Sequence, residues 1–411
     1  MTLHLFQGFG IELEYMIVSR ETLAAMPICD ELLMDAGGQY GDFENGDADW
    51  SNELVLHVLE IKTAGPAPTL EPLPAMFAGQ IKKANRLLMR HNARLLPGGM
   101  HPFFDPASQT HLWPHDYNVV YETYNRIFDC RGHGWSNLQS THLNLPFADD
   151  AEFARLHAAV RLVLPLLPAL SAASPVAEGR LQAEADFRLK CYATNSSRIP
   201  SATGKVIPEP VYSKDAYYRE ILQPIWDDTA PFDPDGNLQG EYANARGAIA
   251  RFDRMAVEIR LLDNQECPAA DVAICALIVE TLKALIAGRW QPLERLSAFP
   301  VDPLAALFRQ VLATAEQTPV DLPELMAAFG LSGKVTAGEV WRSLYEQLMP
   351  AGSALRAAWG PALDVILGKG TLSTRLRRAL GATPARERIT QVWRGLAHCL
   401  SHGKLFDDAA L

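Results

Sequence analysis

The stretch Gly10-Ile11-Glu12-Leu13-Glu14-Tyr15-Met16-Ile17-Val18 places two carboxylates two residues apart in an otherwise apolar, β-prone run. Side chains at positions i and i+2 of a strand share a face, so we expect Glu12 and Glu14 to project together. The opposite face would carry Ile11, Leu13 and Tyr15. Two like charges on a half-buried face are unfavourable unless a cation or a proton lies between them, and a divalent metal would meet that need. Taken alone, the pair fits an exposed strand face with two solvated glutamates better than it fits a site.

Composition indicates a globular protein with enough residues for a large core. The chain has 411 residues, of which 48% are hydrophobic and 21% charged, and no tract is biased. This length suits two or three average domains, or one large catalytic domain with an appendage. The net charge of −11, without any Lys/Arg cluster, argues against a protein that binds phosphate backbones. We therefore expect no nucleic-acid partner.

Cysteine usage and the absence of targeting signals predict a cytoplasmic protein. The six cysteines are scattered and form no C-x-x-C pair, so we expect reduced thiols rather than a zinc site or a disulfide framework. No basic segment followed by an apolar run stands at the start of the sequence. The most apolar stretch, 162–173, is too short to span a membrane and contains Pro165 and Pro168.

Hydrophobic periodicity divides the chain into mixed strands and helices up to residue 268 and helices alone after it. Beyond 10–18, β-type runs occur at 53–63, 93–100, 135–147 and 248–263. Helical spacing occurs at 73–94, 116–128, 151–172 (interrupted by its two prolines), 272–287, 303–315, 322–328, 337–348 and 372–399. The segments predicted as loops are 35–52, 186–215 and 225–240, the last being a candidate lid. The pattern indicates an α+β fold with a sheet of non-consecutive strands and a helical carboxyl-terminal third.

Several acidic or imidazole side chains lie inside runs that otherwise read as buried strand. Oxygen-rich donor sets with an occasional imidazole suit Mg²⁺ or Mn²⁺, and a hard metal with open positions is what ATP phosphates require. Glu53 and Glu60 are seven residues apart, so in one straight strand they would face opposite sides, ~23 Å apart. Both can serve one site only if the chain bends or if Glu53 lies in the preceding loop. The full set is Glu12, Glu14, Glu53, Glu60, His142 and Glu258.

Glu258 and Arg260 repeat the i, i+2 spacing with opposite charges. One interpretation is an ion pair on a strand; the other is a metal ligand beside an arginine that holds a transferring phosphoryl group. Nothing in that segment decides between them. Taken singly, His101 and His142 are each well explained as ordinary core or loop histidines.

Six motifs in order nevertheless resemble one family. They are Gly10-Ile-Glu-Leu-Glu14, Val58-Leu-Glu-Ile-Lys-Thr63, Gly99-Met-His-Pro102, Thr141-His-Leu-Asn144, the run from Leu164 to Pro175 with Glu178-Gly-Arg180, and Ala256-Val-Glu-Ile-Arg-Leu-Leu-Asp263. In order and rough spacing this set, over about residues 5–285, resembles the glutamate-cysteine ligase type 2 family of carboxylate-amine ligases.

The resemblance implies a glutamine-synthetase-like fold in which helices flank a curved antiparallel sheet that lines a funnel. It implies a catalytic domain over 1–290 and a packed helical region over 291–411. ATP and two or more Mg²⁺ or Mn²⁺ ions would serve to phosphorylate a glutamate-type carboxylate, which an amine then attacks. Carried over by residue, the metal ligands are Glu12, Glu14, Glu53, Glu60, His142 and Glu258. Glu60 and Arg260 would act in catalysis, Arg260 on phosphate, and Arg188 on phosphate or a carboxylate. The substrate would contact His101, Asn144 and Arg180.

The sequence departs from the family at one motif. Where the family has a serine-aromatic-arginine, this chain reads Ala185-Asp-Phe-Arg188, so only the arginine matches. The segment 190–213 contains no pattern that indicates cysteine binding. The amine therefore stays open among cysteine, another amino acid, a peptide amine and a small amine, and the oligomeric state, a homo-oligomer included, stays open as well.

Two other functions are compatible with the residues. A guanidino-type phosphotransferase on the same sheet would form ADP without an amide. A ligand-binding homologue that has lost turnover would consume no ATP, although burying so many acids without a cation to hold would be costly.

Overall fold

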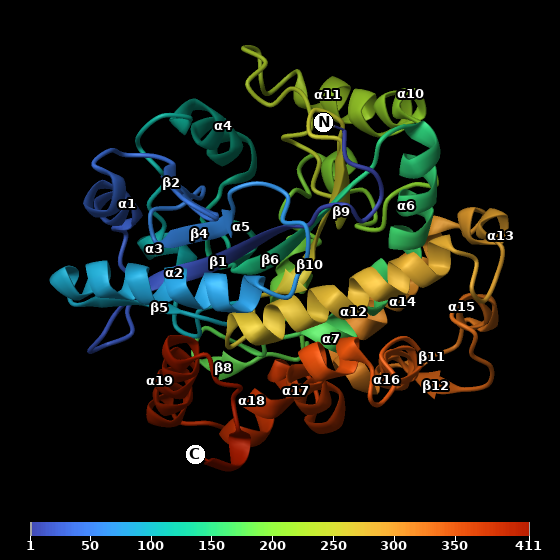
Figure 1. The fold of residues 1–411 in the computed structure, drawn as a ribbon. Coiled ribbons are helices and arrows are strands. Elements are labelled where there is room, and N and C mark those ends of the chain that lie inside the picture. Colours follow the sequence, from blue (N-terminus) through green and yellow to red (C-terminus); the bar gives the residue numbers. More distant parts are fainter. Residues whose placement is uncertain (1, 411) are drawn as a thin grey trace.

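A single eight-stranded antiparallel sheet organises the molecule (Figure 1). The structure is a computed structural model and describes residues 2–410. The strand order is β2 (Phe43–Asn45), β3 (Ala48–Asn52), β4 (Val58–Thr63), β1 (Gly10–Ser19), β6 (Ser140–Pro146), β10 (Ala256–Asp263) and β9 (Ala248–Arg251), with β5 (Ala93–Leu96) also paired to β1. Strand direction turns steadily from β4 to β9, which gives the sheet its curvature (Figure 1).

Helices lie between and after the strands. The first two thirds contain α1 (Cys29–Gly37), α2 (Leu73–Leu88), α3 (Pro106–Gln109), α4 (Asn118–Phe128), α5 (His133–Ser136), α6 (Asp150–Val163), α7 (Pro168–Ser171), α8 (Phe187–Tyr192), α9 (Pro200–Thr203), α10 (Lys214–Tyr217) and α11 (Gln223–Thr229). After the sheet come α12 (Pro268–Ile286), α13 (Leu293–Ser297), α14 (Val301–Thr314), α15 (Pro323–Ala328), α16 (Ala337–Leu348), α17 (Ala354–Lys369), α18 (Leu372–Leu380) and α19 (Arg386–His402). Two small hairpins, β7 (Val176–Ala177) with β8 (Arg180–Leu181) and β11 (Pro319–Val320) with β12 (Val335–Thr336), stand apart from the sheet.

One face of the sheet is apolar and packs against helices. Ile11, Leu13 and Tyr15 of β1 are fully buried, as the alternation in the sequence predicts. They belong to one hydrophobic cluster with residues of β4, β6 and β10 and with the inner faces of α2, α6 and α12. Burying this face at about 25 cal/mol per Å² of apolar surface favours a single register, because a slip by one residue would expose it. The acidic residues of β1 are thereby fixed on the opposite face.

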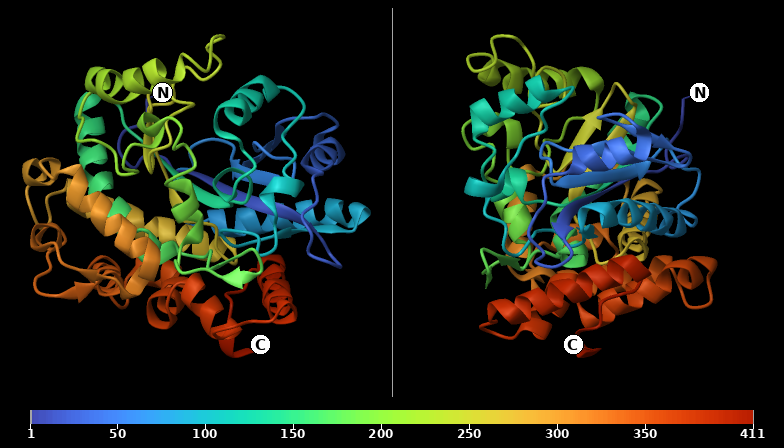
Figure 2. Two further views of the ribbon diagram at one scale, coloured as in Figure 1. Left: turned by 180° about the vertical axis from the view of Figure 1, so that it is seen from behind. Right: turned by 90° about the vertical axis from the view of Figure 1, so that its left-hand side faces the viewer.

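The carboxyl-terminal third is helical, as the sequence predicts. The main cluster continues without a break from the sheet into α14, α16 and α17, so a domain boundary at residue 290 stays a prediction. A second cluster joins α18 and α19 to the far end of β1 and to β5. These last helices form a layer beneath the sheet in both further views (Figure 2). Across residues 2–410, no helix combines the length and apolar character needed to cross a bilayer.

All three predicted loops contain regular structure, so those predictions are wrong in part. Segment 35–52 holds the end of α1 and the β2–β3 hairpin, whose two-residue turn has Gly46 at φ 74°. Segment 186–215 holds α8, α9 and the start of α10, and α11 covers only the first part of 225–240, residues 225–229. These elements are too short for their periodicity to stand out from loop composition.

Four predicted strands are too long, among them 93–100, of which only β5 is strand. Residues 53–57 are not strand but the connection between β3 and β4, residues 133–136 form α5, and residues 252–255 form the turn between β9 and β10. The interruption of helix 151–172 by its prolines is confirmed, since α6 gives way at Leu164–Leu166 to a 3₁₀ turn before α7.

Candidate metal and substrate site

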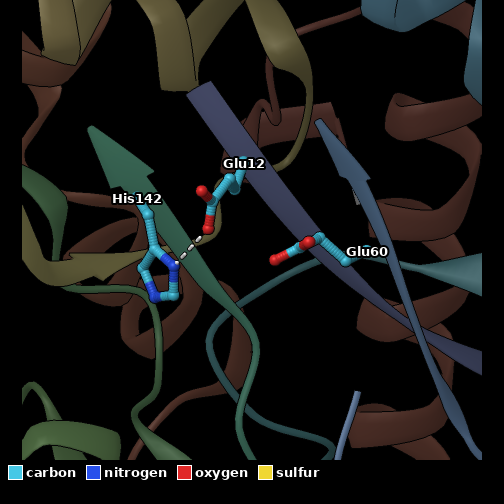
Figure 3. Close-up of side chains that lie close together, drawn as sticks. All are labelled: Glu12, Glu60 and His142. Atoms are coloured by element: carbon cyan, nitrogen blue, oxygen red, sulfur yellow. Dashed lines mark hydrogen bonds and ion pairs between the residues drawn. The ribbon is translucent and has the colours of Figure 1, made fainter. Parts of the chain in front are cut away.

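Strand pairing brings the predicted acidic residues together on the polar face of the sheet. Glu14 lies opposite Glu60 of β4, and Glu12 lies opposite His142 of β6. On the next strand, Glu258 lies opposite Asn144. Figure 3 shows Glu12, Glu60 and His142 projecting from three strands into one space.

Two overlapping sets of side chains have the composition of metal sites. Donor atoms of Glu12, Glu60 and His142 lie within 4.8 Å of one another, and so do those of Glu14, Glu53 and Glu60. Glu60 belongs to both sets. Carboxylate oxygens with one imidazole are the donors that Mg²⁺ and Mn²⁺ accept, so the residues present fit the expected ions.

Each carboxylate is oriented by a specific donor. His142 Nδ1 lies 2.9 Å from Glu12 Oε2, and Asn144 Nδ2 donates to Glu12 Oε1 at 3.0 Å. Glu14 Oε2 accepts from the backbone N–H and the hydroxyl of Ser140, at 2.7 and 2.8 Å. Outer partners of this kind hold ligands in the geometry a metal needs.

Glu60 has the strongest set of partners. Its Oε1 accepts from Ser51 Oγ at 2.8 Å and from Lys62 Nζ at 2.9 Å. Ser51 comes from the β2–β3 hairpin, which pairs it with Glu60 across the strands. Glu60 is therefore held by one partner from the neighbouring strand β3, Ser51, and by one from its own strand β4, Lys62.

Glu53 reaches the site because it follows β3. The connection of residues 53–57 reverses the chain, so that Glu53 and Glu60 meet although a straight strand would part them. Glu53 thus lies in the loop before β4, which is one of the two arrangements that would let both residues serve one site.

The buried acids of the cluster differ in the direction of their pKa shifts. Burial, reinforced by the charge of Glu60, raises the pKa of Glu12 and raises that of Glu53 well above its usual range. Burial opposes ionisation of Glu60 as well, but Lys62 and Ser51 more than offset this and bring its pKa to about 2. For His142, burial favours the neutral ring, yet the hydrogen bond to Glu12 and the charge of Glu14 raise its pKa overall. Such a cluster has too much negative charge for its protein partners alone, and divalent cations would balance it.

Glu258 and Arg260 form an ion pair at the edge of the cluster. Arg260 Nε lies 3.1 Å from Glu258 Oε1, outside hydrogen-bond alignment. Glu258 also lies 3.6 Å from Arg251 and 3.8 Å from His142. The two residues form an ion pair on one strand, and they also lie beside the metal donors. The structure is therefore compatible both with a simple ion pair and with a metal ligand next to a phosphate-binding arginine.

Three adjoining cavities follow the polar face. The central cavity, about 550 Å³, is bordered by Glu12, Glu53, Glu60, His142, Glu258 and Arg260. The outer cavity, about 710 Å³, shares Glu12, Asp42, Lys62 and Arg254 with it, and its other lining residues include Gly10, Pro66, Asn144 and Asp253. The inner cavity, about 180 Å³, shares Glu53, Tyr121, His142, Tyr242 and Arg260 with the central one. The acidic cluster therefore borders the central one of three adjoining cavities, which together are called the channel.

The remaining predicted residues are placed differently from one another. Arg188 borders the inner cavity and is ion-paired through Nε with Asp263. Asn144 contacts Glu12, so it supports a carboxylate of the cluster while bordering the outer cavity. The candidate lid 225–240 does not border the three cavities, whereas Tyr242 does, and a lid role stays a prediction.

His101 and Arg180 do not border the three cavities, so the structure does not bring them to the site. The His101 ring is buried, with Nε2 2.6 Å from the carbonyl oxygen of Leu23 and Nδ1 accepting from the Phe103 N–H. Arg180 is exposed in the β7–β8 hairpin and pairs with Glu178 at 2.6 Å. Gly99, in the motif of His101, allows close packing: a Cβ added there would lie 2.5 Å from the Asp263 carboxylate that holds Arg188.

Sequence reasoning missed several residues of the site. Ser51, Lys62 and Ser140 orient the carboxylates, and the last two lie two residues from Glu60 and His142, so strand alternation could have found them. The aromatic residues of the inner cavity carry no comparable signal, because they come from α4, α5 and α8 and from the segment after α11. They are Tyr121, Tyr124, Phe128, Trp135, Tyr192 and Tyr242.

Comparison with known proteins agrees with this architecture. The family model described as glutamate-cysteine ligase family 2 (GCS2) matches residues 8–307. An uncharacterized protein from Archaeoglobus fulgidus is 33% identical over 319 residues, which cover 77% of this chain and 83% of the relative.

Two solved structures share the fold at low sequence identity. Glutamate–cysteine ligase from Francisella tularensis, in complex with AMP, matches with a TM-score of 0.59 and 13% identity, covering 96% of this chain and 88% of that one. A bifunctional glutathione synthetase from Pasteurella multocida matches with a TM-score of 0.55 and 14% identity, covering 96% of this chain and 52% of that one. The expected fold and the resemblance in the motifs are confirmed, and the chain belongs to the glutamate-cysteine ligase family 2.

Proposed function

We propose that this protein is an ATP- and divalent-metal-dependent carboxylate-amine ligase that activates a glutamate-type carboxylate. The observation that carries the proposal is the pair of donor sets that share Glu60 beside Arg260, in the middle of a channel with room for three reactants. Family membership supports the same reaction class.

The channel gives each reactant a place. The nucleoside part of ATP would occupy the outer cavity, and the phosphates would extend past Lys62 to the cluster. The ions, held by the two donor sets, would supply charge neutralisation for the phosphate oxygens. Arg260 would face the transferring phosphoryl group with its guanidinium.

The reaction proceeds in two displacements. A carboxylate oxygen of the donor attacks the γ-phosphorus of ATP, the bond to the β-phosphate oxygen breaks, and ADP leaves. The amine, after giving a proton to solvent, then forms a C–N bond at the acyl carbon while the C–O bond to phosphate breaks. Phosphate leaves with that electron pair, and the nitrogen loses its second proton as the amide forms. The chain's residues orient both partners in line and exclude water.

A hydroxylamine assay tests the proposal directly. Purified protein with L-glutamate, ATP and Mg²⁺ or Mn²⁺ should release ADP and form the γ-hydroxamate, because hydroxylamine is small enough to intercept an acyl phosphate without a dedicated site. Glu12→Gln should lower the rate by about a hundredfold or more, the scale of losing one contact to the transition state. Glu44→Gln, on edge strand β2 and exposed, is the matched control.

The same assay separates the alternatives. A guanidino-type phosphotransferase would form ADP and a phosphorylated guanidine but no hydroxamate. A homologue without turnover would form no metal-dependent ADP at all. Full hydroxamate formation by Glu12→Gln would overturn the assignment of Glu12 as a metal ligand.

A further inference from the structure

The inner cavity has a wall made of aromatic rings. Phe128 and Trp135 lie 5.3 Å apart between ring centroids, inclined by 24°, and Tyr124 lies 5.5 Å from Trp135. These residues come from α4 and α5, which lie on the polar side of the sheet.

Polar atoms of this wall are already engaged within the protein. Trp135 Nε1 donates to the carbonyl oxygen of Asn195 at 3.1 Å, and the Tyr124 hydroxyl donates to the carbonyl oxygen of Tyr242. The Tyr192 hydroxyl donates to the carbonyl oxygen of Arg246 at 3.3 Å. The rings therefore offer an occupant mainly apolar surface, which favours a flat apolar group over a small polar one.

A buried guanidinium borders the same cavity. Arg188 is 1% exposed, its Nε is fixed by Asp263, and its Nη2 has no hydrogen-bond partner among residues 2–410. A buried cationic donor without a partner costs free energy, and a carboxylate of a bound molecule would satisfy it. The cavity thus combines an aromatic wall with an anchor for an anion.

We propose that the inner cavity binds the acceptor amine and that this acceptor is an aromatic α-amino acid. Its ring would lie against Phe128 and Trp135, and its carboxylate would bind Arg188. Cavities of about 150 Å³ hold a benzene ring, so the inner cavity, at about 180 Å³, has room for the ring of such a molecule. This inference rests on the proposed ligase function.

Position along the channel favours the acceptor over the donor. The donor carboxylate must meet the phosphates at the cluster, in the central cavity, and the nucleotide would enter from the outer side. The acyl carbon is then open to attack from the inner side. An amine held there would form the C–N bond as phosphate leaves toward the cluster, with its protons released to solvent.

Acceptor preference tests the inference. With L-glutamate, ATP and Mg²⁺, we expect kcat/KM for L-phenylalanine to exceed that for L-alanine and L-cysteine by about tenfold or more, the scale of filling an apolar pocket. Phenethylamine, which has the ring but no carboxylate, should also be poorer than L-phenylalanine by about tenfold. Mass spectrometry should identify γ-glutamylphenylalanine as the product.

Hydroxylamine distinguishes the two levels of failure. If the hydroxamate forms but L-cysteine or L-alanine is the better acceptor, the inference is overturned and the ligase function stands. If L-phenylalanine yields its own hydroxamate, it is a donor, and the inference is likewise overturned. If no hydroxamate forms with L-glutamate, the proposed function fails and the inference fails with it.

Variants of the wall and the anchor provide a second readout. Trp135→Leu should lower the ratio of kcat/KM for L-phenylalanine to that for hydroxylamine by about tenfold. Trp290→Leu, the same change at a half-buried tryptophan outside the three cavities, should leave this ratio unaltered. Arg188→Lys keeps a cation beside Asp263 and should narrow the preference for L-phenylalanine over phenethylamine. An unchanged ratio in Trp135→Leu would contradict the placement of the ring.

Discussion

At the scale of single residues, Glu60 is the carboxylate that links the two donor sets. Its pKa falls to about 2, because Lys62 and Ser51 more than offset the cost of burial. Burial, together with the charge of Glu60, raises the pKa values of its neighbours Glu12 and Glu53. An ionised Glu60 at neutral pH gives a cation one fixed negative charge to bind, with Glu12 and Glu53 ionising as the cation arrives.

His101 offers a residue-scale prediction that separates a folding role from substrate binding. Burial lowers its pKa to about 4, against 6.5 in an unfolded chain. The unfolded state therefore binds more protons between these values, and stability present above pH 6.5 is lost as pH falls toward 4. For this one group the loss between pH 7 and pH 5 amounts to about 2 kcal/mol.

The measurement compares wild type with His101→Gln in denaturant titrations at pH 7 and pH 5. His101→Gln has no group that titrates at this position, so it does not lose this pH-dependent contribution to stability. The difference in unfolding free energy between wild type and His101→Gln should therefore narrow by about 2 kcal/mol at pH 5. His4→Gln, at an exposed position, is the control. A gap that stays constant with pH would show that His101 is not buried in the neutral form.

Residue-level prediction from the sequence succeeded where strand alternation decides direction and failed where it does not. Glu12 with Glu14, and Glu258 with Arg260, share a face because each pair is two residues apart on one strand. His101 stands in a motif of the same apparent quality, yet it packs inside the protein, since a motif records which residues occur together and not what they contact. No spacing rule could have selected Trp135, which reaches the inner cavity from a helix.

At the scale of elements, the antiparallel pairing of β1 with β4 sets Glu14 directly opposite Glu60. Like charges in this arrangement destabilise a strand pair, so the sheet has an unfavourable contact that a cation would relieve. Register cannot shift to avoid it, because the apolar face of β1 would then be exposed.

Divalent cations should therefore stabilise the protein measurably. A ligand that binds only the folded state at one hundred times its Kd adds about 2.7 kcal/mol, so Mg²⁺ or Mn²⁺ should raise Tm in differential scanning calorimetry. Glu60→Gln removes a donor from both sets and should reduce this increase more than any other single acid of the cluster. The control Glu44→Gln should retain it. Equal increases in Glu60→Gln and wild type would place the bound cations elsewhere.

Among elements, most long periodic ones were predictable and short ones were not; α17 is long but only weakly amphipathic, and it was not predicted as a separate helix. Helix 337–348 matches α16 residue for residue, and its Thr336 capping box with Glu339 marks its start. The β2–β3 hairpin was missed because its strands span only 3 and 5 residues and their polar composition resembles a loop. This miss concealed the origin of Ser51 and Glu53, which the hairpin delivers to the site.

At the scale of the whole molecule, the last helices are tied to the strand that carries Glu258. Glu266 lies shortly after the end of β10 and is fully buried, with its Oε1 2.6 Å from Nη1 of the equally buried Arg375 of α18. Arg375 also donates to the carbonyl oxygen of Phe406, whose N–H donates to Glu266. One buried ion pair thus joins the end of the sheet, α18 and the carboxyl-terminal segment, although more than a hundred residues separate the two charges in sequence.

Breaking this pair should destabilise the protein, because it leaves a charge buried without its partner. Arg375→Met is expected to lower the unfolding free energy by about 3–5 kcal/mol, while Arg375→Met with Glu266→Leu should recover most of the loss, since both charges are then gone. Arg378→Met on the same helix removes an exposed pair with Asp408 and should cost about 0–1 kcal/mol. Calorimetry of the four proteins gives the comparison. A double variant no more stable than Arg375→Met would mean that packing around the arginine stem, and not the pairing of charges, holds the last helices against the sheet.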